Sequence, residues 1–243
     1  MSASVSWKSY SAQYDLMAEH NPAYQELLAR AKGYFASLAL SPGSVIAEIG
    51  AGTGNYSTLA ASLCPECQIL HIEPDAGMNE VATRKAGRLG LWNIEFLDAT
   101  ADAAPIQPSS VDVVVAVHSL YAMPDPIGTI ARIHTWLRPG GQAFACDLGR
   151  VLDVSDWFSY LRRSLVSRFG YWRTMGILLA GREVAQQNRR IARMQRSGEY
   201  WTHEPDEFVQ TWQKAGFSVL TAEAQYRNYS DLVIAKKPAF SAG

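Results

Sequence analysis

The sequence predicts an α/β fold in which helices cover both faces of a mostly parallel sheet. Short apolar runs rich in β-branched residues alternate with segments of helical periodicity between residues 44 and 147. This alternation is typical of parallel strands that are joined by crossover helices. Near the end of the chain, two apolar runs follow each other with no helical segment between them, so they should form an antiparallel pair. At 243 residues, the chain is long enough for one such domain with an added subdomain.

Two helices are expected before the first strand, at 7–19 and 22–39, because apolar residues recur there at helical spacing. Asn21 and Pro22 supply a cap and a first-turn proline for the second helix. The valine-rich run at 111–117 predicts a strand that is covered on both faces. The other expected elements are strands at 44–49, 68–72, 93–97, 142–147, 217–222 and 231–235, helices at 56–63, 76–88 and 126–137, and turns at 41–43 and 138–141.

Residues 150–203 form an insertion between the fifth strand and the final strand pair. Trp157, Leu161 and Leu165 recur there at helical steps, which predicts helices. The insertion contains ten arginines, no lysine and four acidic residues. These arginines fit a solvated helix face, a lid that binds a carboxylate or phosphate, or a contact with nucleic acid or an anionic membrane. We expect four regions: an N-terminal helical cap (1–39), a core (40–149), a helical lid insertion (150–203), and a C-terminal helix with the strand pair that completes the core sheet (204–243).

Composition argues against several classes of protein. The formal net charge of −1 gives no overall bias toward nucleic acid or membranes. No apolar run reaches the roughly 20 residues that span a bilayer, and the N-terminus lacks the pattern of a secretory signal, so a cytoplasmic location is expected. Cys64 and Cys67 have the spacing of a redox motif or a zinc half-site, but no second ligand pair exists. We therefore expect incidental cysteines, and no metal site, because no ligand cluster is visible.

A glycine-rich turn follows the first strand directly and reads Glu48-x-Gly50-x-Gly52-x-Gly54. Glycines at these positions let a ligand approach the backbone closely. The pattern differs from the dinucleotide fingerprint, whose final glycine would fall at Asn55. Glu48 would also repel a pyrophosphate, so the turn favours a ligand that brings a cationic group.

The motif Glu48-x-Gly50-x-Gly52-x-Gly54 resembles the first motif of class I S-adenosylmethionine-dependent methyltransferases, and 137–141 resembles the turn before strand five in that family. The resemblance runs motif by motif over residues 40–148. It implies a Rossmann-like seven-stranded sheet of order 3-2-1-4-5-7-6 whose last strand is antiparallel. It also implies a cofactor, S-adenosylmethionine, whose methionine part packs against the turn formed by Gly50, Ala51, Gly52 and Gly54.

Further candidate cofactor ligands follow the next strands, where ligands of open α/β sheets collect. Glu73 lies 19 residues after Gly54 and is expected to accept both ribose hydroxyls. The resemblance implies that Asp98 and Ala99 contact the adenine amino group, and Pro74 and Met78 could sandwich the adenine with Ala99. The alternatives are that each acid caps the next helix and that Met78 is a core residue.

His118 follows the fourth strand and is a candidate for acid–base chemistry, substrate orientation and cofactor contact. Tyr14 and Asp15 resemble a pair in small-molecule methyltransferases, where the N-terminal helix folds over the cofactor. Tyr10 lies one turn earlier and could share that face. Aromatic faces or phenol oxygens would stabilise the sulfonium, although core packing is the alternative for both tyrosines. His203 is a weaker candidate.

Together, these features predict methyl transfer from S-adenosylmethionine to an N, O or C nucleophile of a small molecule, by in-line displacement under a closing lid. The arginine-rich insertion would suit an anionic acceptor. A nucleic-acid or protein methyltransferase and a non-catalytic S-adenosylmethionine-binding protein are the alternatives. Nucleic acid is the less expected substrate, because residues 118–124 depart from the Asn/Asp-Pro-Pro-Tyr/Phe segment of enzymes that methylate base amino groups.

Overall fold

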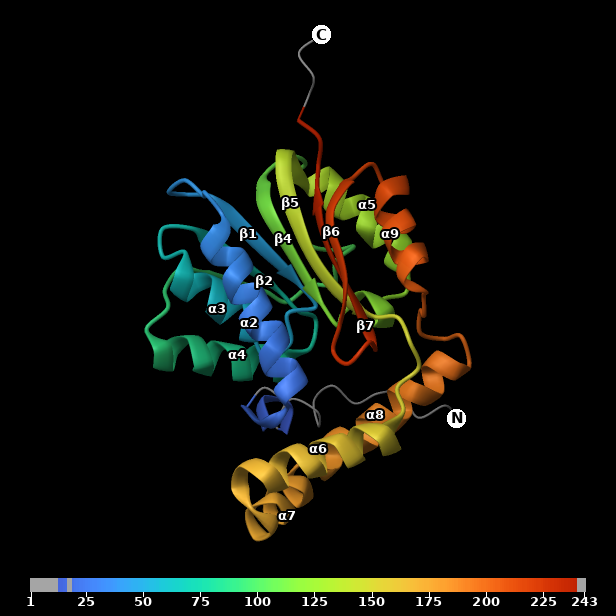
Figure 1. The fold of residues 1–243 in the computed structure, drawn as a ribbon. Coiled ribbons are helices and arrows are strands. Elements are labelled where there is room, and N and C mark those ends of the chain that lie inside the picture. The colour runs from blue at the N-terminus through green and yellow to red at the C-terminus, as the bar shows by residue number, and fades with distance from the viewer. Residues whose placement is uncertain (1–12, 17–18, 240–243) are drawn as a thin grey trace.

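A seven-stranded sheet forms the centre of the computed structural model, which describes residues 13–16 and 19–239 (Figure 1). The strand order is β3-β2-β1-β4-β5-β7-β6, and β7 is antiparallel to both of its neighbours. The expected fold class is therefore confirmed, including the antiparallel last strand. The strands are β1 (Val45–Ile49), β2 (Gln68–Ile72), β3 (Ile94–Leu97), β4 (Val111–Val117), β5 (Leu137–Leu148), β6 (Ser218–Gln225) and β7 (Ser230–Lys236).

Strand β4 shows why this sequence buries both faces of the sheet. Val113, Val115 and Val117 belong to an apolar cluster with helices α2 (Pro22–Ser37) and α3 (Asn55–Leu63). Val114 and Ala116 point the other way and pack with α5 (Pro126–Trp136) and α9 (Pro205–Lys214). Because side chains alternate along a strand, a continuous apolar run serves both cores.

Local capping sets several helix starts as the sequence indicates. Asn21 Oδ1 accepts a hydrogen bond from Ala23 N at 3.1 Å, at the start of α2. Asp75 Oδ1 accepts one from Met78 N at 2.9 Å, at the start of α4 (Ala76–Leu89). Each cap satisfies a backbone donor that the helix cannot satisfy itself.

Strand β5 begins earlier than expected, because residues 138–141 belong to the strand rather than to a free turn. Leu137 pairs with Val111, and Gly140 N donates to Lys237 O at 2.9 Å. Gly140 takes a φ of +84°, which glycine adopts without strain. The turn motif thus becomes the irregular start of a long strand that gains backbone partners on both sides.

The insertion (residues 150–203) folds into three helices, α6 (Val154–Phe169), α7 (Tyr171–Ala180) and α8 (Arg182–Arg196). Figure 1 shows them beyond the carboxyl ends of the parallel strands, with α7 farthest from the sheet. Gly170, with a φ of +76°, separates the first two helices. No helix in residues 13–16 or 19–239 has the length and apolarity that crossing a bilayer requires.

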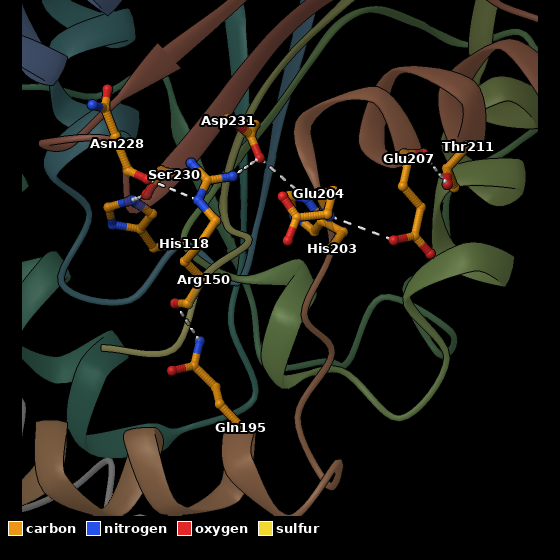
Figure 2. Close-up of polar contacts among 10 residues, drawn as sticks. All are labelled: His118, Arg150, Gln195, His203, Glu204, Glu207, Thr211, Asn228, Ser230 and Asp231. Carbon is orange, nitrogen blue, oxygen red and sulfur yellow. Dashed lines mark hydrogen bonds and ion pairs between the residues drawn. The ribbon is translucent and has the colours of Figure 1, made fainter. Parts of the chain in front are cut away.

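Both ends of the insertion are held at one point of the sheet, by Asp231 (Figure 2). Arg150 forms an ion pair with Asp231, and His203 Nδ1 lies 3.2 Å from Asp231 Oδ2. Burial alone would raise the pKa of Asp231, but the contact with His203 and the hydrogen bond from Arg150 outweigh it and lower that pKa. Gln195 reinforces this clasp from α8, because its Oε1 accepts from Leu152 N at 3.0 Å.

Candidate functional site

The glycine turn after β1 has a backbone that only glycine adopts readily, since φ is +60° at Gly50, +56° at Gly52 and +75° at Gly54. A Cβ on Gly50 would lie 2.5 Å from Ser119 Cβ, whereas one on Gly52 would meet no atom of the described residues within 4 Å. Gly54 is the N-cap of α3, and a Cβ there would lie 3.0 Å from Ala82 Cβ. The turn is therefore packed at Gly50 and Gly54 and open at Gly52.

A cavity of about 1210 Å³ starts at this turn and continues between the sheet and the helical insertion. It brings together most of the sequence-predicted cofactor residues from four strand ends, one turn and the N-terminal segment. Gly54 and Asp98 are not among its lining residues. The candidates that line it are Tyr14, Glu48, Gly50, Ala51, Gly52, Glu73, Pro74, Met78, Ala99 and His118.

Glu73 connects the end of β2 to the glycine turn. Its Oε2 accepts from Gly52 N and its Oε1 from Asp75 N, both at 2.9 Å. The residue is 8% exposed, and burial raises its pKa. A carboxylate has about four acceptor positions, so Glu73 can hold these two backbone donors and still accept from a ligand in the cavity.

Asp98 does not line the cavity, although its neighbour Ala99 does. It is exposed, and its Oδ1 accepts from Asn79 Nδ2 at 2.5 Å, while the same nitrogen donates to Glu73 O at 2.8 Å. The end of β3 reaches the cavity through the residues that follow Asp98, namely Ala99, Thr100, Ala101 and Asp102. The sequence analysis did not predict Thr100, Ala101 and Asp102 as lining residues, although residues that directly follow a parallel strand are candidates for ligand contact.

Glu48 is 4% exposed beneath the turn, and burial raises its pKa to about 8. Ser57 Oγ donates to Glu48 and also lies 3.0 Å from His71 Nδ1. His71 is a packed core histidine, as expected, and burial lowers its pKa to about 4. At neutral pH these groups are largely uncharged, so a cationic ligand would change the charge state of Glu48.

The described part of the N-terminal segment is fixed to the glycine turn. Asp15 Oδ1 accepts from Thr53 Oγ1 at 2.8 Å and from Lys85 Nζ at 2.9 Å. Tyr14 lines the cavity, and its ring packs edge-on against Tyr24 with centroids 6.1 Å apart. Tyr10 lies outside the described residues.

His118 lies in the wall of the cavity between the turn and the insertion. Its Nε2 is 2.8 Å from Ser230 Oγ, and its ring centroid is 4.6 Å from that of Tyr226. Burial lowers the pKa of His118 to about 3, so the ring is neutral at physiological pH. Tyr226 also lines the cavity, and it comes from the β6–β7 turn, where the sequence gives no signal for it. His203, in contrast, belongs to the Asp231 clasp (Figure 2).

The half of the cavity that lies under the insertion is mostly apolar. Side chains from all three insertion helices line it, with two arginines, Arg182 and Arg189, among them. The apolar lining residues of these helices are Val154, Trp157, Phe158, Leu161, Leu165, Ile177, Leu178, Val184, Ala185 and Ile191. The arrangement joins a polar, glycine-lined pocket to an apolar chamber.

Comparison with known proteins agrees with this geometry. A family model described as a methyltransferase domain matches residues 47–145. Demethylmenaquinone methyltransferase of Lactococcus lactis subsp. lactis (strain IL1403) is 31% identical over 137 residues, which cover 56% of this chain and 54% of that protein. The chain thus spans about half the length of that relative. Malonyl-[acyl-carrier protein] O-methyltransferase of Marinomonas sp. (strain MWYL1) is 22% identical over 217 residues, covering 88% and 76% of the two chains.

A solved structure shows the same fold. A SAM dependent methyltransferase from Aquifex aeolicus matches with a TM-score of 0.60 and 16% identity, over 92% of this chain and 97% of that one. The matched methyltransferase domain over residues 47–145, the strand order and the glycine turn thus agree with the resemblance to class I S-adenosylmethionine-dependent methyltransferases that the sequence motif indicates.

Proposed function

We propose that the chain transfers a methyl group from S-adenosylmethionine to a small molecule with a substantial apolar part. The continuous cavity carries this proposal, because it joins the glycine turn and Glu73 to a chamber of apolar side chains. The relative named for demethylmenaquinone supports an apolar acceptor, and the relative named for malonyl-acyl-carrier protein supports an acceptor that carries a carboxylate.

The residues of the polar half fit the cofactor. Because Gly52 has no side chain, the space beside it in the cavity is open to the cofactor. Glu73 retains acceptor positions for the ribose hydroxyls. Pro74, Met78 and Ala99 line the part of the cavity where the adenine would lie. Glu48 and Tyr14 would face the cationic groups, for which a carboxylate and an aromatic ring are suitable partners.

The protein contributes mainly position and water exclusion to this reaction. When bound, S-adenosylmethionine supplies a methyl group that its own sulfonium activates. The chain holds the acceptor in line with that methyl group, which is worth several kcal/mol of barrier in well-oriented reactions. His118 is assigned to orienting the acceptor, because an imidazole with a pKa of about 3 is a poor proton acceptor at neutral pH.

The helical insertion would act as the lid in this scheme. Its ends are fixed by the Asp231 clasp, and its helices form the apolar walls of the chamber. Arg182 and Arg189 would hold an anionic group of the acceptor, since guanidinium groups suit carboxylates and phosphates. Whether the methyl group goes to nitrogen, oxygen or carbon depends on which nucleophile the acceptor carries.

Isothermal titration calorimetry with S-adenosylmethionine and with S-adenosylhomocysteine tests the proposal. We expect both to bind with micromolar-range affinity, and we expect single-turnover transfer of a labelled methyl group to apolar phenolic or carboxylic acceptors. Lack of binding by both compounds would overturn the proposal. Binding without transfer to any acceptor in a metabolite extract would favour the non-catalytic alternative.

The affinity for S-adenosylmethionine should depend on pH through Glu48. Below pH 8 the buried carboxyl is protonated, because burial raises its pKa to about 8. A bound cation favours the ionised form, so binding should release a proton. Affinity should therefore rise with pH and level off near pH 8, by up to about tenfold per pH unit.

The matched variant is Glu48→Gln, which keeps the shape of the side chain and cannot ionise. Calorimetry in buffers of different ionisation enthalpy should show proton release for the unaltered chain and less for this variant. Equal proton release by both would assign the pH dependence to the cofactor's own amino group and not to Glu48.

A further inference from the structure

Helix α7 carries an exposed apolar face. Its large side chains include Trp172, 86% exposed, and Leu179, 68% exposed, together with Tyr171 and Met175 at 55% and 42%. These four residues fall within one arc of the helix, because each residue turns it by about 100°. We call them the α7 face. Thr174, which lies outside this arc, is buried.

The segment that carries the α7 face is rich in arginine and lacks acidic residues. Residues 157–182 contain five arginines and no aspartate or glutamate. Arg168 and Arg173 lie over the ring of Phe169, at 5.0 Å and 4.9 Å from its centroid. Both guanidinium groups therefore lie near the junction of α6 and α7, at the end of the helix where the α7 face begins.

The position of α7 matches a role in surface contact. Figure 1 shows α7 at the end of the insertion that is farthest from the sheet. Ile177 and Leu178, from the same helix, line the apolar half of the cavity. One helix therefore presents apolar side chains both outward and into the chamber.

We propose that the α7 face docks onto an anionic lipid bilayer. Aromatic and aliphatic side chains on one face, with arginines around them, are the features of helices that lie in a membrane interface. Anionic lipid headgroups complement the four arginines of this segment that do not line the cavity, and each contributes about fivefold to binding at such a surface. They are Arg162, Arg163, Arg168 and Arg173. A protein partner would also accept an apolar face, but the absence of acidic residues over 157–182 favours a surface of uniform negative charge.

The docking does not depend on the proposed methyl transfer, although it would place the chamber next to apolar acceptors.

Cosedimentation of the full chain with vesicles tests the proposal. We expect binding to vesicles of phosphatidylcholine with phosphatidylglycerol, weaker binding to phosphatidylcholine alone, and loss of binding as salt is raised. Trp172→Ala should weaken binding about tenfold, since it removes a large side chain from the interface. The matched control is Trp92→Ala, because Trp92 is 89% exposed between α4 and β3, and its loss should change nothing.

A second pair of variants separates charge from apolar contact. The double variant Arg168→Gln with Arg173→Gln should weaken binding to anionic vesicles about 25-fold, whereas Arg88→Gln on α4 should leave it unchanged. Circular dichroism and binding of S-adenosylmethionine should be the same in all variants, which separates a failure here from a failure of the proposed function.

Three results would overturn the docking proposal: no vesicle binding by the unaltered chain, equal binding by Trp172→Ala and Trp92→Ala, or binding to neutral vesicles alone. Self-association in sedimentation velocity that disappears in Trp172→Ala, without vesicle binding, would assign the α7 face to a second copy of this chain. Retention on RNA in place of vesicles would assign the arginines to nucleic acid.

Discussion

Gly50→Ala is expected to lower the free energy of unfolding by about 2–5 kcal/mol, the sum of left-handed backbone strain and overpacking. The new Cβ would lie 2.5 Å from Ser119 Cβ, in a conformation with a φ of +60°. Relief requires movement of either the glycine turn or the segment after β4. Because both form the cavity, we expect cofactor binding to fall together with stability.

Urea denaturation of Gly50→Ala, Gly52→Ala and Gly43→Ala measures this effect against two controls. Gly43 has a φ of +81° in an exposed turn, and a Cβ there would meet no atom of the described chain within 4 Å. The loss of stability in Gly43→Ala therefore measures the left-handed backbone strain alone, about 1–2 kcal/mol. Gly52→Ala should cost a similar amount of stability but should also weaken cofactor binding, because its Cβ enters the cavity. Equal destabilisation by Gly50→Ala and Gly43→Ala would contradict the predicted clash.

Glu73→Ala is expected to weaken binding of S-adenosylmethionine by about a hundredfold or more, because each hydrogen bond to a charged group is worth about 1.5–3 kcal/mol. The substitution removes the proposed acceptor of two ribose hydroxyls. It also leaves Gly52 N and Asp75 N without their acceptor, so the turn loses its connection to the start of α4.

Glu80→Ala is the matched control, since Glu80 is an exposed acid on α4 that forms an ion pair with Arg84 on the same helix. Calorimetry should find its affinity for the cofactor unchanged. A Glu73→Ala variant that binds the cofactor as tightly as Glu80→Ala would remove Glu73 from the proposed ribose site.

The sheet and the polar half of the cavity could be predicted from the sequence because the signals are local. Strand-ending residues such as Glu48 and Glu73 lie at one edge of a parallel sheet by topology, and the glycine turn reveals its backbone directly. Asp98 shows which contacts such local signals do not predict. Asp98 lies at the expected strand end, but its carboxylate accepts a hydrogen bond from the side chain of Asn79 on α4. No local sequence pattern connects these two residues.

The apolar chamber required the structure. Trp157 and Leu165 read in sequence as an amphipathic helix, and the spacing alone does not say whether their apolar face packs against the core or lines a cavity. Tyr226 reaches the chamber from a turn, through long-range packing against His118. The chemistry of His118 also depends on burial, which lowers its pKa to about 3 and which depends on neighbours far away in sequence.

The Asp231 clasp has a consequence for how this chain can diversify. Arg150 and His203 contact the same carboxylate, so the two ends of the insertion stay together when residues are added or removed between them. Doubling the length of the insertion would raise the free energy of loop closure by only about 0.6 kcal/mol. Natural variation can therefore exchange or resize the whole segment as a cassette. Selectivity for the acceptor can then drift while the scaffold that carries the glycine turn stays the same.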